Sequence, residues 1–171
     1  MISSRLSRVA CVSAAAALVG LLAASDAEAQ TQAPVKQAAQ TKPTKSASTA
    51  THKVAIQVNQ NDKAVMDLAL NNAKNVIDYY KEKGETVAVE IVTYGPGLHM
   101  LRADTSPVKE RIAPMSLENP SLAFIACGNT QANQSKAEGK PVTLLSEAKV
   151  VPSGVVRLIE LQKQGYAYIR P

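Results

Sequence analysis

Short strand-like runs alternate with longer helix-like stretches along most of this chain, and that order restricts its fold more than any other feature. Runs rich in β-branched and apolar residues lie at 54–58, 86–93, 122–127, 148–151 and 166–169. The stretches between them place apolar residues three and four positions apart, which is typical of amphipathic helices. Parallel strands need a long crossover, which a helix supplies. The order therefore predicts an α/β domain with a mostly parallel sheet between helix layers.

Side chains that cap helices mark where several of these helices begin. Asn61 and Asp62 are N-cap candidates for the helix that runs from about residue 63. Asn129 or Thr130 is expected to cap the helix after the 122–127 strand. Ser153 is expected to cap the last helix, whose apolar face spans residues 155–161. Each cap follows a strand-like run closely, so the predicted turns are short.

The run at 122–127 is the most apolar strand, as expected for a strand covered on both faces. In open parallel sheets, ligands bind beyond the carboxyl ends of the strands. Several polar and glycine residues follow predicted strands and meet at that edge. The candidate binding residues there are Asn59, Tyr94, Gly95, Gly97, His99, Gly128, Asn129, Thr130 and Ser153.

Cys127, the last residue of the most apolar run, is the candidate catalytic residue. A helix that begins within about two residues would lower the pKa of its thiol, because backbone N–H groups at a helix start favour an anion. Gly128 would let the backbone approach the sulfur or a ligand closely, and Asn129 or Thr130 could donate to an oxyanion. The alternative is that Cys127 is a small buried hydrophobic residue, as free cysteines often are.

The other candidate functional motifs in the sequence are less specific than Cys127. His99 could serve as a base or bind a substrate, although a single histidine in a turn is also ordinary polar surface. Residues 52–171 hold two histidines and one cysteine without ligand spacing, so we expect no metal site. The turn at 94–97 lacks the Lys-Ser/Thr pair of a phosphate loop, and the chain has no Gly-x-Ser-x-Gly motif. We expect no cofactor.

The first 51 residues differ in composition from the rest of the chain. Arg5 and Arg8 precede an apolar stretch at 9–24, and Ala27-Glu28-Ala29 follows as a cleavage site, so residues 1–29 are predicted to be a signal peptide. An uncleaved membrane anchor is the alternative, but the stretch is shorter than the ~20 residues that a span needs. Residues 30–51 are rich in Ala, Gln, Thr, Lys, Ser and Pro, which predicts a disordered linker.

These boundaries leave residues 52–171 as one domain of a periplasmic or secreted protein. We expect no stable membrane insertion after the signal is cleaved. The domain carries 14 basic and 12 acidic residues and no Trp. A nearly balanced charge without tryptophan argues against nucleic acid as a partner.

Four separated segments resemble the DsrE/DsrF-like family, most closely its small exported branch. They read YGPGL at 94–98, FIACGNT at 124–130, VPSGVV at 151–156 and QGYAYIRP at 164–171. The resemblance covers residues 53–171. It implies a three-layer α/β/α sandwich with a five-stranded parallel sheet in the order 4-3-2-1-5, and assembly into homo- or hetero-oligomers. Better-known members carry sulfur as a cysteine persulfide, and Cys127 stands where such a cysteine would be.

Two functions are open at this point. One is a sulfur carrier or thiol-redox protein that uses Cys127, with a sulfur donor or acceptor protein or a small sulfane-sulfur compound as its partner. The other is a non-catalytic oligomeric binding module in which Cys127 only packs. Under both we expect a homo-oligomer, and whether the protein is an enzyme stays open.

Overall fold

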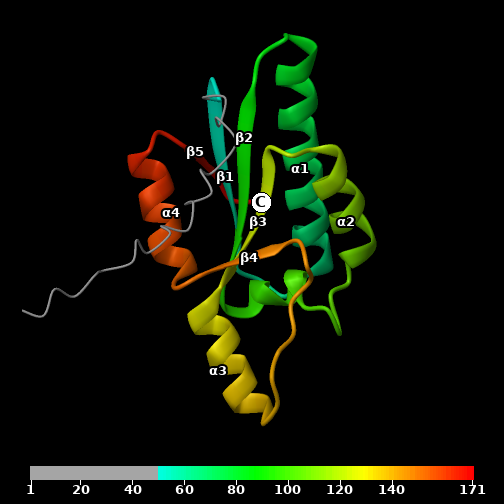
Figure 1. Ribbon diagram of the computed structural model, residues 1–171, viewed down its shortest axis with the longest axis vertical. Helices are drawn as coiled ribbons and strands as arrows, with labels where there is room; N and C mark the ends of the chain where they lie inside the picture. The colour runs from blue at the N-terminus through cyan, green and yellow to red at the C-terminus, as the bar shows by residue number, and fades with distance from the viewer. Residues whose placement is uncertain (1–49) are drawn as a thin grey trace, which may run out of the picture. The chain divides into compact units, whose positions relative to one another are not determined.

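The computed structural model describes residues 50–171, which form one five-stranded sheet with helices on both faces (Figure 1). The predicted signal peptide at 1–29 and residues 30–49 of the predicted linker lie outside the described residues. In chain order the elements are β1 (His52–Val58), α1 (Lys63–Glu82), β2 (Val87–Thr93), the 3-10 helix η1 (Gly95–Leu101), α2 (Lys109–Glu118), β3 (Leu122–Cys127), α3 (Gly128–Glu138), β4 (Ala148–Val151), α4 (Gly154–Lys163) and β5 (Ala167–Ile169).

The strands lie in the order β4-β3-β2-β1-β5, and each neighbouring pair is parallel. This confirms the parallel sheet that the sequence pattern predicts and the strand order that the resemblance implies. The edge strands β4 and β5 have four and three residues. Short edges of this kind limit pairing with other chains.

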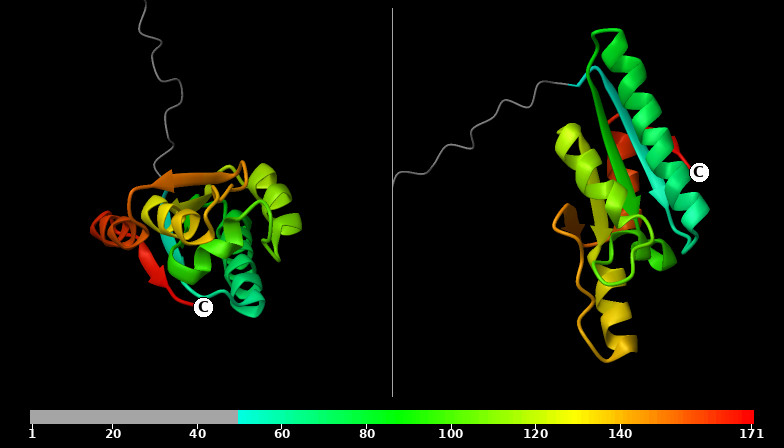
Figure 2. Two further views of the ribbon diagram at one scale, coloured as in Figure 1. Left: turned by 90° about the horizontal axis from the view of Figure 1, so that it is seen from below. Right: turned by 90° about the vertical axis from the view of Figure 1, so that its right-hand side faces the viewer.

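The helices divide into two layers (Figures 1 and 2). Helices α1 and α2 cover one face of the sheet, and α4 covers the other. The core on the α1 and α2 side is the larger of the two. The core on the α4 side contains five buried residues, namely Ala55, Val92, Ile125, Leu158 and Leu161. The domain is therefore a three-layer α/β/α sandwich with unequal cores.

Helix α1 shows why these residues form a helix at this place. The Asp62 carboxylate accepts a hydrogen bond from Ala64 N–H at 2.8 Å, so Asp62 is the N-cap of the two candidates. Five residues at helical spacing are buried on its inner face, namely Met66, Ala69, Leu70, Ala73 and Ile77. A one-sided apolar stripe of this kind fixes the helix to the sheet.

Two element ends are set by contacts that local hydrophobic spacing does not encode. Strand β1 begins at His52, before the predicted run at 54–58, and the His52 N–H donates to Thr86 O at 3.0 Å while its ring stacks on Tyr80 with centroids 3.8 Å apart. Helix α2 ends at Glu118, and Asn119 closes it with two hydrogen bonds to the Met115 carbonyl.

Helix α3 begins at Gly128, which is earlier than a cap at Asn129 or Thr130 would place its start. The prediction that Asn129 or Thr130 caps this helix is wrong: Cys127 is the N-cap, and its sulfur accepts from Thr130 N–H at 3.5 Å. Helix α3 follows β3 without a loop, so the last strand residue has to take the capping role.

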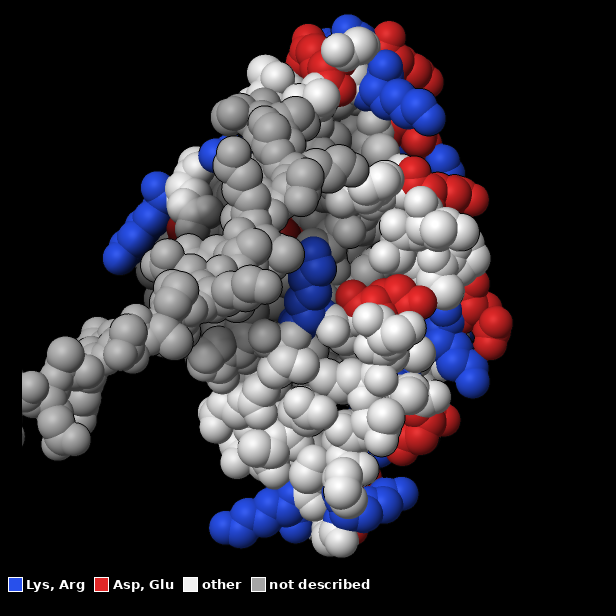
Figure 3. Space-filling model, in the orientation of Figure 1, with Lys and Arg blue, Asp and Glu red and all other residues white. Residues whose placement is uncertain are grey.

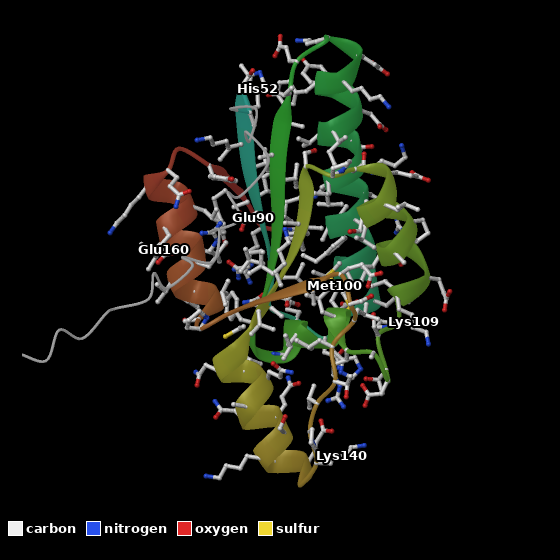
Figure 4. The ribbon with its side chains drawn as sticks, in the orientation of Figure 1. His52, Glu90, Met100, Lys109, Lys140 and Glu160 are labelled. Atoms are coloured by element: carbon white, nitrogen blue, oxygen red, sulfur yellow. The ribbon has the colours of Figure 1, made fainter. Side chains whose placement is uncertain are left out.

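Helix α3 projects from the end of the sheet, and none of its residues is buried (Figure 1). Lys140, just past its end, lies at the lower end of the described residues in the view of Figure 4. The buried Arg102 side chain ties this end back, because Nη2 donates to Glu138 Oε2 at 2.9 Å and to Asp104 Oδ2 at 2.7 Å. The far end of α3 is thus held mainly by polar contacts.

Charge is mixed on the surface. Lys and Arg side chains alternate with Asp and Glu along the α1 and α2 side of the face drawn in Figure 3. Within residues 50–171, none of the helices has both the length and the apolar character needed to cross a membrane.

Candidate functional site

Cys127 lies at the carboxyl end of β3 with 4% of its surface exposed. Side chains alternate along a strand, so Cys127 shares a face with Ile125, which packs in the α4-side core. On the neighbouring strand β4, its register partner is Val151. The thiol therefore lies on the α4 side of the sheet.

Hydrogen-bond donors from two helices surround the Cys127 sulfur. Helix α3 contributes the N–H of Thr130, whose nitrogen lies 3.5 Å from the sulfur. The Thr130 hydroxyl and the backbone N–H groups of Asn129 and of Gly154, the first residue of α4, also act on the thiol by lowering its pKa. Both helix starts carry partial positive charge, so they act together on one sulfur atom.

These contacts change the acidity of the thiol. Burial raises the pKa of Cys127, because a thiolate is poorly stabilised away from water. The hydrogen bonds from the Thr130 hydroxyl and the N–H groups of Gly154, Thr130 and Asn129 lower it by more, and the net pKa of the thiol lies below its ordinary value. The direction agrees with the prediction made for a cysteine at a helix start.

Gly154 lets α4 come this close to the sulfur. A Cβ atom at this position would lie 3.0 Å from Tyr94 Cβ, 3.3 Å from Cys127 Cβ and 3.3 Å from the Thr93 carbonyl oxygen. Sequence reasoning missed Gly154 as a site residue. The signal was present, because Pro152-Ser153-Gly154 follows a strand at the same sheet edge as Cys127.

The other predicted glycines serve the packing around this point. A Cβ on Gly97 would lie 2.2 Å from the Val58 carbonyl oxygen, so only glycine allows η1 to press against the end of β1. A Cβ on Gly128 would lie 3.1 Å from Val150 Cγ1. Gly95 donates its N–H to Thr130 Oγ1 at 3.0 Å, which joins η1 directly to the residue that binds the sulfur.

Tyr94 follows β2 and Asn59 follows β1, at the same edge of the sheet as the thiol. Burial raises the pKa of the Tyr94 hydroxyl, with a further contribution from Tyr168 and an opposing hydrogen bond from Asn59. Tyr94 is therefore uncharged near neutral pH. The Tyr94 side chain packs against Gly154, which also lies next to the Cys127 side chain, so Tyr94 is part of the wall around Cys127.

Comparison with solved structures places the fold among known proteins. The structure of a protein of unknown function, MTH1491 from Methanobacterium thermoautotrophicum, is similar, with a TM-score of 0.59 and 30% sequence identity. The match covers 70% of this chain and 99% of that protein. The chain belongs to the MTH1491 family. No family model and no curated protein matches it.

Two predicted site residues have structural tasks in this member of the MTH1491 family. The Ser153 hydroxyl accepts from Val156 N–H at 3.5 Å, which confirms Ser153 as the N-cap of α4 and fixes Gly154 beside the sulfur. Asn129 N–H also donates to the Pro152 carbonyl at 3.1 Å, which ties α3 to the segment before α4. The Asn129 side chain is exposed.

His99 is not joined to the thiol. It lies on η1 and is partly buried, and its backbone carbonyl accepts from Arg102 N–H at 3.3 Å. Among residues 50–171, no hydrogen bond links the His99 side chain to Cys127 or Thr130. The same part of this MTH1491-family chain contains no group of three or more His, Cys, Asp or Glu residues that could hold a metal ion.

Proposed function

We propose that this chain is an exported DsrE/DsrF-like sulfur carrier in which Cys127 accepts a sulfane sulfur atom. The observation that carries the proposal is the convergence of two helix N-termini on the Cys127 sulfur, with a thiol pKa below its ordinary value. Export rests on the sequence of residues 1–29. Membership in the MTH1491 family adds the fold but no activity, since MTH1491 is itself a protein of unknown function.

In the first step, the Cys127 thiolate attacks the outer sulfur of a donor persulfide, R–S–SH. A new S–S bond forms at Cys127 while the donor S–S bond breaks. The leaving thiolate takes the electron pair of the broken bond, and the proton of the donor passes to it. The step is an exchange between sulfur atoms and needs no oxidant.

In the second step, an acceptor thiolate attacks the outer sulfur of the Cys127 persulfide. The bond to Cys127 breaks, and its sulfur leaves as a thiolate. The N–H groups of Thr130 and Gly154 would stabilise this leaving group, because Thr130 N–H donates to the same atom in the resting protein and Gly154 N–H lowers the pKa of its thiol. The same geometry therefore assists both loading and release.

The second candidate is a non-catalytic oligomeric binding module in which Cys127 only fills space. Its 4% exposure favours this alternative, because a donor molecule must reach the sulfur. The two candidates make different predictions about thiol access, so one experiment separates them.

That experiment uses the full chain with Cys11→Ser, which leaves Cys127 as the single thiol, and compares it with a Cys11→Ser, Cys127→Ser control. After incubation with inorganic polysulfide, intact-protein mass spectrometry should show the mass of one added sulfur on the first protein only. Loss of the added sulfur on incubation with a small thiol would show transfer. A thiol that neither takes up sulfur nor reacts with iodoacetamide until the chain is unfolded would support the binding module and overturn the carrier.

We also propose that the protein self-associates. Helix α4 buries Leu158 and Leu161 against the sheet, yet Val155, Val156 and Ile159 on its other side are 47%, 51% and 48% exposed. A helix that is apolar on two faces gains from a second partner.

A further inference from the structure

A buried glutamine near the end of β1 uses only one side of its amide within the fold. Gln57 is 7% exposed, and its Oε1 atom accepts a hydrogen bond from the Tyr168 hydroxyl of β5. Among residues 50–171, no hydrogen bond is made by the nitrogen of this amide, Nε2. A donor held in so enclosed a place costs free energy unless it finds an acceptor. The Nε2 group is therefore available to a bound molecule.

The strand register places Arg170 beside Gln57. Strands β1 and β5 are parallel, and Ala55 lies opposite Tyr168. Two residues further along the same register, Gln57 comes opposite Arg170. Side chains alternate along a strand, and Ala55 packs in the α4-side core. Gln57, Tyr168 and Arg170 therefore share the α4 side of the sheet.

Arg170 differs from the other arginines of the described domain in its charge partners. The guanidinium groups of Arg102, Arg111 and Arg157 each form an ion pair with an Asp or Glu side chain. Within residues 50–171, Arg170 forms no ion pair, and the residue is exposed. A planar guanidinium can donate to both oxygens of one carboxylate. Arg170 is therefore available to bind a carboxylate that the domain itself does not supply.

Uncharged polar and aromatic groups border the same place. Asn59 and Tyr94 are the residues that follow β1 and β2. Burial raises the pKa of the Tyr94 hydroxyl, Tyr168 raises it further, and Asn59 and the positive charge of Arg170 lower it. This influence agrees with the register, which gathers these side chains at one edge of the sheet. None of Asn59, Gln57 and Tyr94 carries a charge near neutral pH, so they do not repel an anion.

We propose that Arg170 and Gln57 form a binding site for a small organic carboxylate at this edge of the sheet. The Arg170 guanidinium neutralises the carboxylate, and Gln57 Nε2 donates to one of its oxygens. The Tyr168 hydroxyl donates to Gln57 Oε1 and so fixes which end of the amide is left for the ligand. The site lies beyond the carboxyl ends of parallel strands, where ligands of such sheets bind. The inference goes beyond the proposed function, because it requires nothing of Cys127.

The test is a titration of the isotopically labelled full chain with sodium acetate, followed in amide NMR spectra, with sodium sulfate at the same ionic strength as the comparison. Acetate should cause saturable shifts confined to amides around Gln57 and Arg170. Arg170→Gln should weaken the fitted affinity about fivefold. Gln57→Met, which keeps the length of the side chain without its donor, should weaken it about threefold. If Gln57→Met does not fold, Tyr168→Phe replaces it and should also weaken the affinity, because the Gln57 amide is no longer fixed.

Lys149→Gln is the matched control. It removes one positive charge from an exposed residue on the same face of the sheet, because Lys149 lies opposite Ile125, but at the other edge strand. Its acetate affinity should equal that of the parent chain. Shifts that do not saturate, shifts of the same size with sulfate, an unchanged affinity in Arg170→Gln, or equal weakening by Lys149→Gln would overturn the proposal. The titration uses no sulfur donor, so this result and the result of the polysulfide experiment can fail independently.

Discussion

Among single residues, Cys127 takes its acidity from burial and hydrogen bonds that oppose one another. Burial raises its pKa, while donors from α3 and α4 lower it further than burial raises it. The polar groups responsible are mostly backbone N–H groups, which side-chain substitution does not remove. The acidity of this thiol is therefore a property of how two helices begin.

This lowered pKa couples thiol ionisation to stability. A thiol with a lower pKa in the folded chain than in the unfolded chain stabilises the fold above the unfolded value, about 8.5. That contribution is lost as the pH falls through the folded pKa. We therefore predict that the free energy of unfolding of the Cys11→Ser chain increases relative to that of the Cys11→Ser, Cys127→Ser chain as the pH rises toward the unfolded pKa, about 8.5.

Urea unfolding at each pH, followed by circular dichroism, measures this difference. A gap between the two chains that stays constant over the range, or one that narrows as the pH rises, would mean that the folded thiol has an ordinary or a raised pKa.

Gly154 sets the distance between α4 and the sulfur. The Cβ of a Gly154→Ala variant would meet Tyr94 Cβ at 3.0 Å and Cys127 Cβ at 3.3 Å, and both atoms are fixed close to the backbone. We predict a loss of about 1–3 kcal/mol in the free energy of unfolding. The apparent pKa of Cys127 should rise as well, since the Gly154 N–H moves away from the sulfur.

Urea unfolding gives the first quantity for Gly154→Ala, and iodoacetamide labelling rate against pH gives the second. Val155→Ala is the matched control, because this neighbouring side chain is 47% exposed and should change neither quantity by much. Stability and labelling like those of the parent chain would show that α4 can shift without affecting the thiol.

Part of this site could be predicted from the sequence, and part could not. Cys127 and Thr130 could be predicted, because a strand end followed by a polar helix is visible in local pattern. The sequence pattern favours Asn129 or Thr130 as the cap because sulfur is a weak acceptor, but strand and helix join without a loop and Cys127 is the N-cap. The position of Gly154 at this sheet edge is visible in the sequence, but its close approach to Cys127 and Tyr94 depends on a contact between distant segments.

Among the elements, α3 is the one least supported by apolar packing. It has no buried residue, and its outer end is held by the ion pairs of Arg102 with Glu138 and Asp104. The hydrogen bonds to Arg102 are the main cause that lowers the pKa of both carboxylates. Helices α1 and α4 and the central strands β1, β2 and β3 bury apolar residues, so the pattern that makes them predictable is also the one that stabilises them.

We predict that Arg102→Met loosens α3 locally. Amide hydrogen exchange should speed up in the outer turns of α3, while α1 and the sheet keep their protection. A carboxylate whose pKa is lowered in the folded chain stabilises the fold at pH values above its ordinary pKa, near 4. This stabilisation is lost as the pH falls through the folded pKa. The parent chain should therefore approach the behaviour of Arg102→Met in acid.

Lys149→Met, which removes an exposed cation on β4, is the control and should leave α3 exchange unchanged. Equal exchange in the Arg102→Met and parent chains at neutral pH would show that the ion pairs do not hold the helix.

On the scale of the whole molecule, the two faces of the sheet are covered unequally. Helices α1 and α2 share one face, whereas α4 covers the other with a smaller core (Figure 2). Glu90 on β2, which lies on the α4 side in Figure 4, binds Arg157 and adds a polar tie to that layer. The helix in the thinner layer, α4, exposes three aliphatic side chains, namely Val155, Val156 and Ile159.

Covering that apolar side should drive self-association, so we predict that the parent chain forms particles of more than one copy in light scattering at micromolar concentration. Val156→Lys with Ile159→Lys should shift the particles to single chains, because both side chains are about half exposed and would place charges in the contact. The free energy of unfolding of the dissociated chain should stay close to that of Leu68→Lys, an exposed substitution on the opposite layer that should leave association intact. If the parent chain is monomeric in light scattering, the proposal that the protein self-associates is wrong. If the variant with both lysines still associates, the contact lies on another surface.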